Sequence, residues 1–290
     1  GVPVVEWEID PALDGMAPAM GPTGGASLFT WRAANVASWR DRGFESTHYL
    51  PLAANTQRRR PLPEAALDRG KYGAPVAFVG NSQAEHTPRL RASLQGLIEV
   101  WARGRGHTDP GAEGRRLIQV LLTEASAALP MNVAPALIEA HCPALEAQRV
   151  ASGVRSDPAM LLAEIVGALW RLQAVGCLAP QGVHVWGDPG WAPLTRNGVR
   201  VRGFAGHSTE LTAIYNTVDV NVDIGRIYQP DIVTMRVFDV LACGGFLLAA
   251  WSEELGELFE LGRELETWRT LPELKDKVGF YLARPALRRT

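Results

Sequence analysis

Apolar positions follow two different periods along the chain. Short β-branched and apolar runs predict strands at residues 2–9, 27–30, 47–52, 75–79, 183–186, 199–203, 218–222 and 246–250. Apolar residues at helical spacing predict helices at residues 33–42, 88–102, 113–128, 133–140, 158–175, 208–215, 233–242, 252–259 and 271–282. Strands that alternate with helices indicate an α/β protein, in which helices cover parallel sheets.

The chain divides near residue 72. Residues 55–72 contain a run of three arginines followed by two prolines, which is typical of a linker between domains. We therefore expect a first domain at residues 1–72, linker included, and a second at residues 73–290. The second domain carries a mainly helical insertion at residues 87–176.

Residues 218–250 contain the strongest candidate for a functional site. The pattern predicts a strand, a loop, a helix that starts near Pro230, a glycine turn and a buried strand. Asp231, Thr234 and Arg236 would lie at or near the start of this helix, where free N–H groups and the helix dipole attract phosphate. Arg236 adds a forked pair of donors that suits a diphosphate.

A second carboxylate, Asp239, follows Asp231 by eight residues, or about 12 Å if both are helical. That separation suits an elongated ligand with hydroxyl groups at both ends. In the alternative interpretation, Arg236 and Asp239 form only a surface ion pair at i, i+3 spacing.

Composition excludes several classes of protein. A hydrophobic content of 47% with 21% charged residues is typical of a globular domain, and a net charge of −2 argues against a general binder of nucleic acid or anionic membrane. No apolar run of eighteen residues or more predicts a membrane span, and no signal peptide is present. Cys142, Cys177 and Cys243 are odd in number and widely separated, which favours reduced thiols in a cytoplasmic chain over disulfides or a zinc site.

The segment around Arg236 resembles the signature of the group 1 glycosyltransferases, and most closely that of the CgeB-like (spore maturation protein) branch. The branch pattern ends in T-x-R-x-F-E-x-x-A-C-G-G-F, which this chain matches from Thr234 to Phe246, with Asp239 in place of the usual Glu. The wider E-x7-E spacing persists as Asp231-x7-Asp239. Compared with the family, the chain resembles a fragment whose first domain is incomplete.

The resemblance implies a GT-B fold, with two Rossmann-like domains facing across a cleft. It also implies transfer of a sugar from a nucleotide-sugar donor to an acceptor, with retention and without a bound metal or other cofactor. Arg236 would stabilise the departing diphosphate, Asp231 would hold the donor sugar, and Asp239 would bind the ribose hydroxyls. Further donor contacts are expected from Gly80, Asn81, His207, Glu210, Arg226, Tyr228, Gln229, Thr234, Gly244 and Gly245.

Several of these positions allow a simpler interpretation. Gly80 and Asn81 end a strand that resembles the family's V-x-F-V-G-N, but they also suit an ordinary turn. His207 and Glu210 are placed beside the nucleotide base by the resemblance, whereas His207 alone suits a loop cap. Acidic residues near the first strand, Glu6, Glu8 and Asp10, either face an acceptor or are solvated.

The sequence therefore predicts a cytoplasmic hexosyltransferase whose partners are a nucleotide-sugar and a protein or glycan acceptor. Two alternatives remain at this point. The same architecture hosts sugar-nucleotide epimerases, and the two Asp residues in place of Glu suit a catalytically weakened nucleotide-sugar-binding or interaction module.

Overall fold

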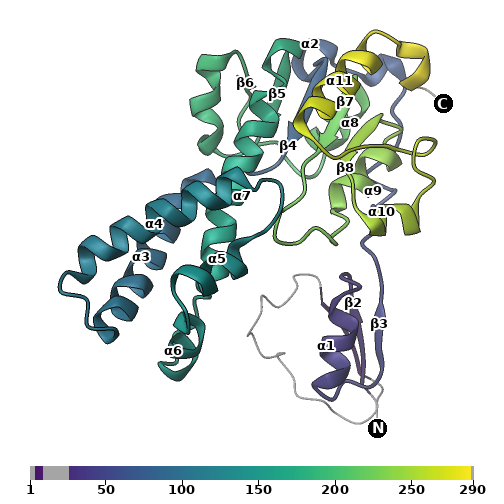
Figure 1. Cartoon of the computed structure of the whole chain (residues 1–290). Coiled ribbons are helices and arrows are strands. Elements are labelled where there is room, and N and C mark those ends of the chain that lie inside the picture. The colour runs from purple at the N-terminus through teal and green to yellow at the C-terminus, as the bar shows by residue number, and fades with distance from the viewer. Residues whose placement is uncertain (1–3, 9–25, 289–290) are drawn as a thin grey trace.

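A computed structural model describes residues 4–8 and 26–288, which form a mixed α/β structure with two parallel sheets (Figure 1). The smaller sheet has the order β1-β2-β3, with strands Val4–Glu8, Ala26–Thr30 and Thr47–Tyr49. Helix α1 (Asn35–Asp41) connects β2 to β3, and its Trp39 packs with Leu28 and Phe44 in a small core of their own. The predicted β-α-β alternation is confirmed in this part of the chain.

The larger sheet has six parallel strands in the order β6-β5-β4-β7-β8-β9. They are β4 (Val76–Val79), β5 (Val183–Trp186), β6 (Arg200–Val201), β7 (Val220–Asp223), β8 (Leu247–Ala250) and β9 (Glu266–Trp268). Strand β4, the first strand of the larger sheet along the chain, lies in the middle of that sheet. The chain adds β5 and β6 on one side of β4 and β7 to β9 on the other, so the strand order reverses between β4 and β7. In open sheets of this kind, ligands bind at the carboxyl ends of the strands where the order reverses.

Side chains of the larger sheet alternate between two cores. Val76 and Phe78 of β4 enter the core formed with α3, α7 and α11, whereas Ala77 enters the core formed with α8, α9 and α10. Both faces of the sheet are therefore buried. Because both faces are buried, the sequences of these strands are continuous apolar runs.

The helices after α1 follow in chain order. They are α2 (Arg69–Tyr72), α3 (Thr87–Gly104), α4 (Pro110–Ala127), α5 (Ala134–His141), α6 (Leu145–Ala151), α7 (Pro158–Gly176), α8 (Glu210–Thr217), α9 (Met235–Ala242), α10 (Glu253–Leu258) and α11 (Leu271–Leu282). Helices α3 to α6 extend away from the larger sheet as a block, and α7 leads back from this block to β5 (Figure 1).

Two predicted details of the central unit are corrected. The helix starts at Met235, not near Pro230, because Asp231 to Val233 form a turn and an extended segment before it. Asp231 is thus outside the helix, and the 12 Å estimate does not apply. The helix ends as expected at the glycine pair, where Gly244 adopts a φ of 69° that favours glycine.

Helix α7 is the most apolar helix of the described residues. The segment Pro158–Gln181 is long and apolar enough to cross a membrane, although 61% of its 18-residue apolar window is buried inside the structure. Mostly buried core helices have the same length and composition, so this feature is weak evidence for a membrane span.

Candidate functional site

A cavity of about 640 Å³ lies at the carboxyl ends of β4 and β7, where the strand order reverses. We call it the switch-point cavity. The smaller sheet contributes Trp31 and Leu52 to its wall, so the cavity lies between the two parts of the molecule. The larger part contributes Asn81, Gln83, His86, Leu90, Glu164, Arg171, Asp188, Arg226, Tyr228, Gln229, Ile232, Thr234, Met235 and Arg236.

Three arginines give one wall of this cavity a positive charge: Arg171, Arg226 and Arg236. Arg171 reaches the cavity from α7 and is 7% exposed, with its guanidinium donating to the carbonyl oxygen of Asn81 at 2.7 Å. Burial, together with the neighbouring Arg236 and Arg226, lowers the pKa of Arg171 to about 10. A bound anion would offset this clustering of like charges.

Arg236 is held in place by the protein itself. Its Nε donates to the carbonyl oxygen of Val79 at 2.7 Å, and its Nη1 pairs with the buried carboxylate of Asp223 at the end of β7. Its guanidinium also lies 4.6 Å from the ring centroid of Phe78. A Cβ on Gly80 would approach Arg236 Nη2 to 2.6 Å, so a larger residue there would displace this guanidinium from its present position.

Three residues of the cavity wall each contain a buried polar atom without a hydrogen-bond partner. Among the described residues, Trp31 Nε1, Gln83 Oε1 and Arg171 Nε are buried and make no hydrogen bond, and all three residues line the switch-point cavity. Buried polar atoms are almost always paired, and leaving one unpaired costs about 1–3 kcal/mol. Each of these atoms exposes less than 1 Å² to solvent, so it lies behind the cavity surface and does not face a ligand in the cavity as the wall stands.

Glu164 of α7 and Tyr228 line the same cavity, close to Arg226. Burial raises the pKa of Glu164, although Arg226 and His86 act in the opposite direction. Burial also raises the pKa of Tyr228, whose hydroxyl lies 3.4 Å from Gln83 Nε2. These oxygen and amide groups suit the hydroxyls of a sugar.

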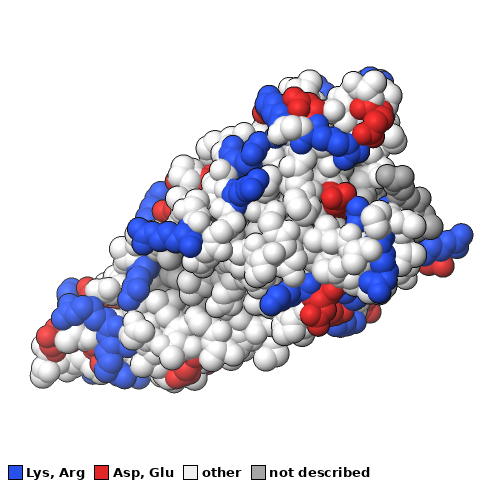
Figure 2. Space-filling view, turned by 90° about the horizontal axis from the view of Figure 1, so that it is seen from above, with Lys and Arg blue, Asp and Glu red and all other residues white. Residues whose placement is uncertain are grey.

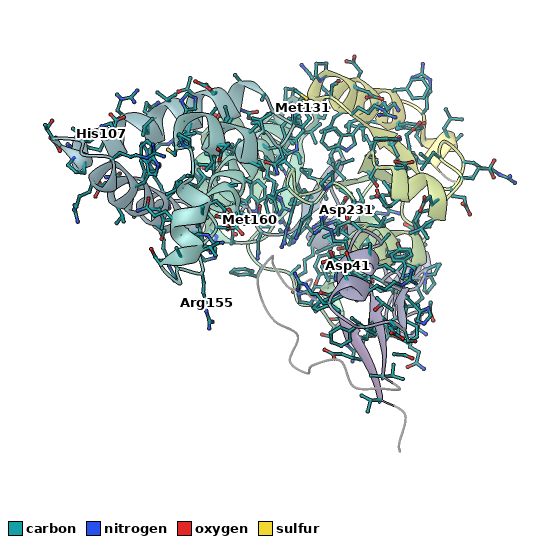
Figure 3. All side chains as sticks on the ribbon, turned by 60° about the horizontal axis from the view of Figure 1, so that its bottom comes forward. Asp41, His107, Met131, Arg155, Met160 and Asp231 are labelled. Carbon is teal, nitrogen blue, oxygen red and sulfur yellow. The ribbon has the colours of Figure 1, made fainter. Side chains whose placement is uncertain are left out.

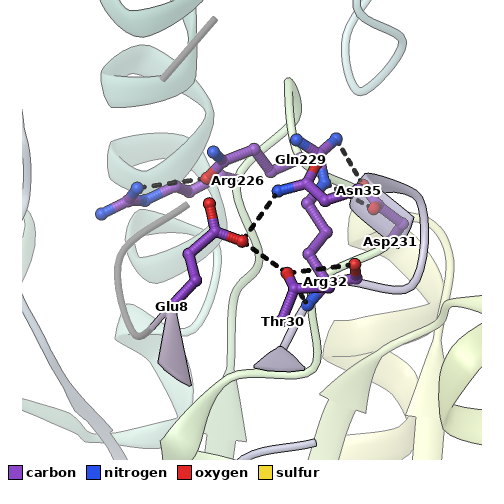
Figure 4. A network of polar contacts seen from close by, with 7 residues as sticks. All are labelled: Glu8, Thr30, Arg32, Asn35, Arg226, Gln229 and Asp231. Carbon is purple, nitrogen blue, oxygen red and sulfur yellow. Dashed lines mark hydrogen bonds and ion pairs between the residues drawn. The ribbon is translucent and has the colours of Figure 1, made fainter. Parts of the chain in front are cut away.

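The loop between β7 and α9 is fixed by two polar contacts (Figure 4). Arg226 donates to the side-chain oxygen of Gln229 at 3.1 Å. Arg32 of the smaller sheet binds Asp231 in a bidentate pair, at 2.6 and 2.9 Å. Asp231 thus faces the smaller sheet, and it does not line the switch-point cavity.

The acidic residues of β1 lie beside this loop. Glu8 is buried and accepts hydrogen bonds from Thr30, Asn35 and Trp39 (Figure 4 shows the first two), so its carboxylate holds the smaller sheet together. Glu6 is partly buried on the same strand, and Asp10 lies outside the described residues.

Asp239 of α9 does not line the switch-point cavity. It is 6% exposed and pairs with the equally buried Arg59 at 2.9 Å, and Arg59 also donates to Thr212 Oγ1. The simple surface pair of Asp239 with Arg236 is therefore wrong, because each side chain has a different buried partner.

Four other predicted contacts lie away from this cavity. Glu210 accepts from Lys71, Tyr72 and the Gly206 N–H beside α8, and His207 is exposed in the loop before that helix. Gly244 and Gly245 precede β8, so they lie at the amino end of the sheet rather than the carboxyl end.

The structure brings the remaining predicted residues together. Asn81, Thr234 and Arg236 line the cavity with the loop residues Arg226, Tyr228 and Gln229, and Gly80 lies directly beneath Arg236. Sequence reasoning missed Arg171 and Glu164, which are seven residues apart and therefore share one face of α7. The sequence signal that could have identified them is a pair of charged residues on one face of an otherwise apolar helix.

Residues 163–290 match the model of a family described as glycosyl transferase-like. This part of the chain is glycosyltransferase-like. The match begins within α7, extends through β5 to β9, and includes all three cavity arginines. It supports the resemblance to the group 1 glycosyltransferases and a function in glycosyl transfer. No curated protein matches the chain.

Charge and metal-binding groups add two observations. On the face shown in Figure 2, basic side chains form separate groups among acidic and uncharged residues. Within residues 4–8 and 26–288, no group of three or more His, Cys, Asp or Glu side chains is placed to hold a metal ion.

Proposed function

We propose that the protein transfers a hexose from a nucleotide-sugar donor to a hydroxyl acceptor, and that the switch-point cavity holds the diphosphate and the sugar. The three arginines of the cavity wall, Arg171, Arg226 and Arg236, carry this proposal, because their clustered positive charge suits a diphosphate. The glycosyltransferase-like match over residues 163–290 supports the choice of ligand.

The positive wall suits the diphosphate. Arg171 and Arg226 face the cavity, and the first turn of α9 brings unpaired backbone N–H groups and a positive dipole end near Thr234. Glu164, Gln83 and Tyr228 line the same cavity, and their polar groups suit the sugar hydroxyls. Side chains and a helix end supply the positive charge, so we propose that the reaction needs no metal ion.

The chemistry follows from this placement. The acceptor oxygen bonds to the anomeric carbon as the bond from that carbon to the phosphate oxygen breaks, and the electron pair leaves with the nucleoside diphosphate. In a retaining reaction, both events occur on one face of the sugar, and the hydroxyl proton passes to the departing phosphate oxygen. The arginines stabilise the charge that develops on that oxygen.

The roles first assigned to the two aspartates depend on their arginine partners. Asp231 contacts a donor sugar only if it shares or releases Arg32. Asp239 reaches a ribose only if the segment around Arg59 moves away. We retain both as proposals, together with a GT-B arrangement, CgeB-like kinship and a cytoplasmic location, for which the free thiols of Cys142, Cys177 and Cys243 provide support.

The buried Arg59–Asp239 pair also favours a second candidate, a binding module that holds a nucleotide-sugar without transferring the sugar. Mass spectrometry of the bound donor distinguishes the two. A module leaves the donor intact over hours with any acceptor, whereas a transferase releases the nucleoside diphosphate.

The test of the donor site is a thermal-shift panel with UDP, GDP, ADP, CDP and dTDP. We expect one diphosphate to raise the midpoint of unfolding, because a ligand that binds only the folded state stabilises it. Arg226→Gln should weaken that binding by about 10- to 100-fold, since a charge-assisted hydrogen bond contributes about 1.5–3 kcal/mol. Arg226 is exposed, so this variant leaves the core intact.

Arg263→Gln is the matched control. Arg263 is also an exposed arginine, and it lies in the turn before β9, away from the switch-point cavity. Equal shifts in wild type, Arg226→Gln and Arg263→Gln, or no shift with any diphosphate, would contradict the proposal.

A further inference from the structure

A second cavity, of about 440 Å³, lies at the carboxyl ends of β7, β8 and β9. We call it the apolar cavity. Most of its wall is hydrocarbon or aromatic, from Pro130, Met131, Trp170, Ile227, Pro230, Ile232, Val233, Val237, Ala250, Trp251, Leu255 and Trp268. Its volume and lining are typical of small-molecule sites, which are largely apolar with a few polar groups.

Three polar side chains of this wall, Asp223, Ser252 and Trp268, already have partners. Asp223 accepts from Thr234 and Arg236, Ser252 Oγ accepts the Leu255 N–H at the start of α10, and Trp268 Nε1 donates to the Asp223 carbonyl oxygen at 3.2 Å. A nucleobase needs partners for the donors and acceptors along its edge. These walls therefore favour an occupant with an apolar body over a base.

The rim of the apolar cavity is positively charged. The guanidinium of Arg269 lies 3.4 Å from the ring centroid of Trp251, and both side chains are exposed. Within the described ranges no carboxylate forms an ion pair with the Arg269 side chain; the Glu273 carboxylate accepts from the Arg269 backbone N–H and pairs with Lys277. Arg226 adds a second positive charge to the lining. An occupant with a carboxylate would complement this rim.

The opposite rim comes from the helical block. Met131 is 66% exposed in the loop between α4 and α5, and it lies where this block faces the last strands of the larger sheet (Figure 3). Methionine adapts to ligands of different shape, so an exposed methionine at a cavity mouth suits a variable apolar group.

The two cavities adjoin each other. Arg226, Ile232 and Thr234 line both of them, so only the loop before α9 and the start of that helix separate their contents. An occupant of the apolar cavity can therefore present a group to the sugar that the switch-point cavity would hold.

We propose that the apolar cavity is the acceptor subsite, and that it takes a hydroxylated acid with a flat apolar body, such as a hydroxyaryl carboxylate. This inference rests on the proposed function. The apolar body lies between Trp170, Ile232 and Trp268, and the carboxylate meets Arg269. The hydroxyl points toward the shared wall, where its oxygen bonds to the anomeric carbon as the diphosphate leaves with the electron pair of the broken bond.

The experiment titrates the protein with 8-anilinonaphthalene-1-sulfonate, an apolar aromatic anion that fluoresces in such sites. We expect saturable binding that 6-hydroxy-2-naphthoate displaces at least tenfold more strongly than its neutral methyl ester. Arg269→Gln should remove this difference between acid and ester. Ala250→Trp, which fills the cavity from the end of β8, should abolish dye binding.

Controls separate this inference from the donor site. Arg263→Gln should leave dye binding unchanged, and Ala250→Trp should keep both its circular dichroism spectrum and its thermal shift with the nucleoside diphosphate. If wild type shows no thermal shift with any nucleoside diphosphate, this result contradicts the proposed donor site but not the proposed ligand of the apolar cavity. Dye displacement by the nucleoside diphosphate would assign the apolar cavity to the base and overturn the inference. So would equal displacement by acid and ester, or the absence of saturable binding.

Discussion

Individual polar residues in this chain are used first to hold elements together. Arg236 joins α9 to the ends of β4 and β7 through Val79 and Asp223, and Arg59 joins the linker to α9 through Asp239. Removing one member of such a buried pair leaves an unpaired charge and costs about 3–5 kcal/mol. Alanine at Arg236 would therefore disturb the fold as well as any phosphate contact, whereas Arg226 is exposed and gives a cleaner test.

His184 gives a prediction about acid stability. Burial lowers its pKa below 6.5, and Arg202 and Arg200 act in the same direction. Its Nδ1 is buried and makes no hydrogen bond within the described part of the chain. The unfolded chain therefore binds one more proton than the folded chain as the pH falls below 6.5, and the stability contributed by neutral His184 is lost in that direction.

We expect His184→Leu to remove the pH dependence of stability that comes from protonation of His184. Between pH 6.5 and the lowered pKa, the free energy of unfolding of wild type should fall more steeply than that of the variant, by up to about 1.4 kcal/mol per pH unit. Urea unfolding at several pH values provides the measurement. Parallel pH profiles for the two proteins would show that His184 is not the titrating group.

At the scale of elements, α7 connects the fold to the candidate site. Asp157 caps its first turn by accepting from the N–H groups of Ala159 and Met160, and Pro158 occupies a position where no N–H is needed. The rest of the helix is largely buried and presents Glu164 and Arg171 to the switch-point cavity. The position at which α7 starts therefore determines that Glu164 and Arg171 face the cavity.

Asp157→Ala should lower the free energy of unfolding by about 1 kcal/mol, because an N-cap side chain contributes about that much. Gln173→Ala, on an exposed position of the same helix, is the matched control and should change stability by less than about 0.5 kcal/mol. Chemical denaturation of both variants measures the difference. A loss of equal size in the two variants would contradict the role of the cap.

At the scale of the whole molecule, the smaller sheet has little core of its own and depends on contacts with the larger part. Within the described residues its separate core contains Leu28, Trp39 and Phe44. The bidentate Arg32–Asp231 pair joins the two parts beside the switch-point cavity, and Trp31 forms part of the cavity wall. Ligand binding and the contact between the two parts are therefore expected to be coupled.

Arg32→Gln should loosen this contact without unfolding the larger part. We expect faster amide hydrogen exchange across residues 26–49 and unchanged exchange in β4, β7 and β8, since opening of one unit is local. Arg42→Gln, at an exposed position just after α1, serves as the control within the same unit. Uniform acceleration over the whole chain, or none anywhere, would count against this coupling.

The sequence by itself determined the periodic features. Helix α11 begins and ends at the predicted residues, and the strands around Val76, Val183 and Leu247 were readable because both of their faces are apolar. The signature from Thr234 to Phe246 likewise pointed to glycosyl transfer, and the family match over residues 163–290 supports it.

Only the tertiary structure decided which polar groups meet. Asp231 and Asp239 are eight residues apart in the chain, yet one pairs with Arg32 and the other with Arg59, because the turn before Met235 and the sides of α9 direct them to different neighbours. Arg171 and Gln83 enter the same cavity from segments that are far apart in sequence. Local periodicity reports which face of an element is apolar, but pairing of charges depends on how distant elements pack, and that information is not local.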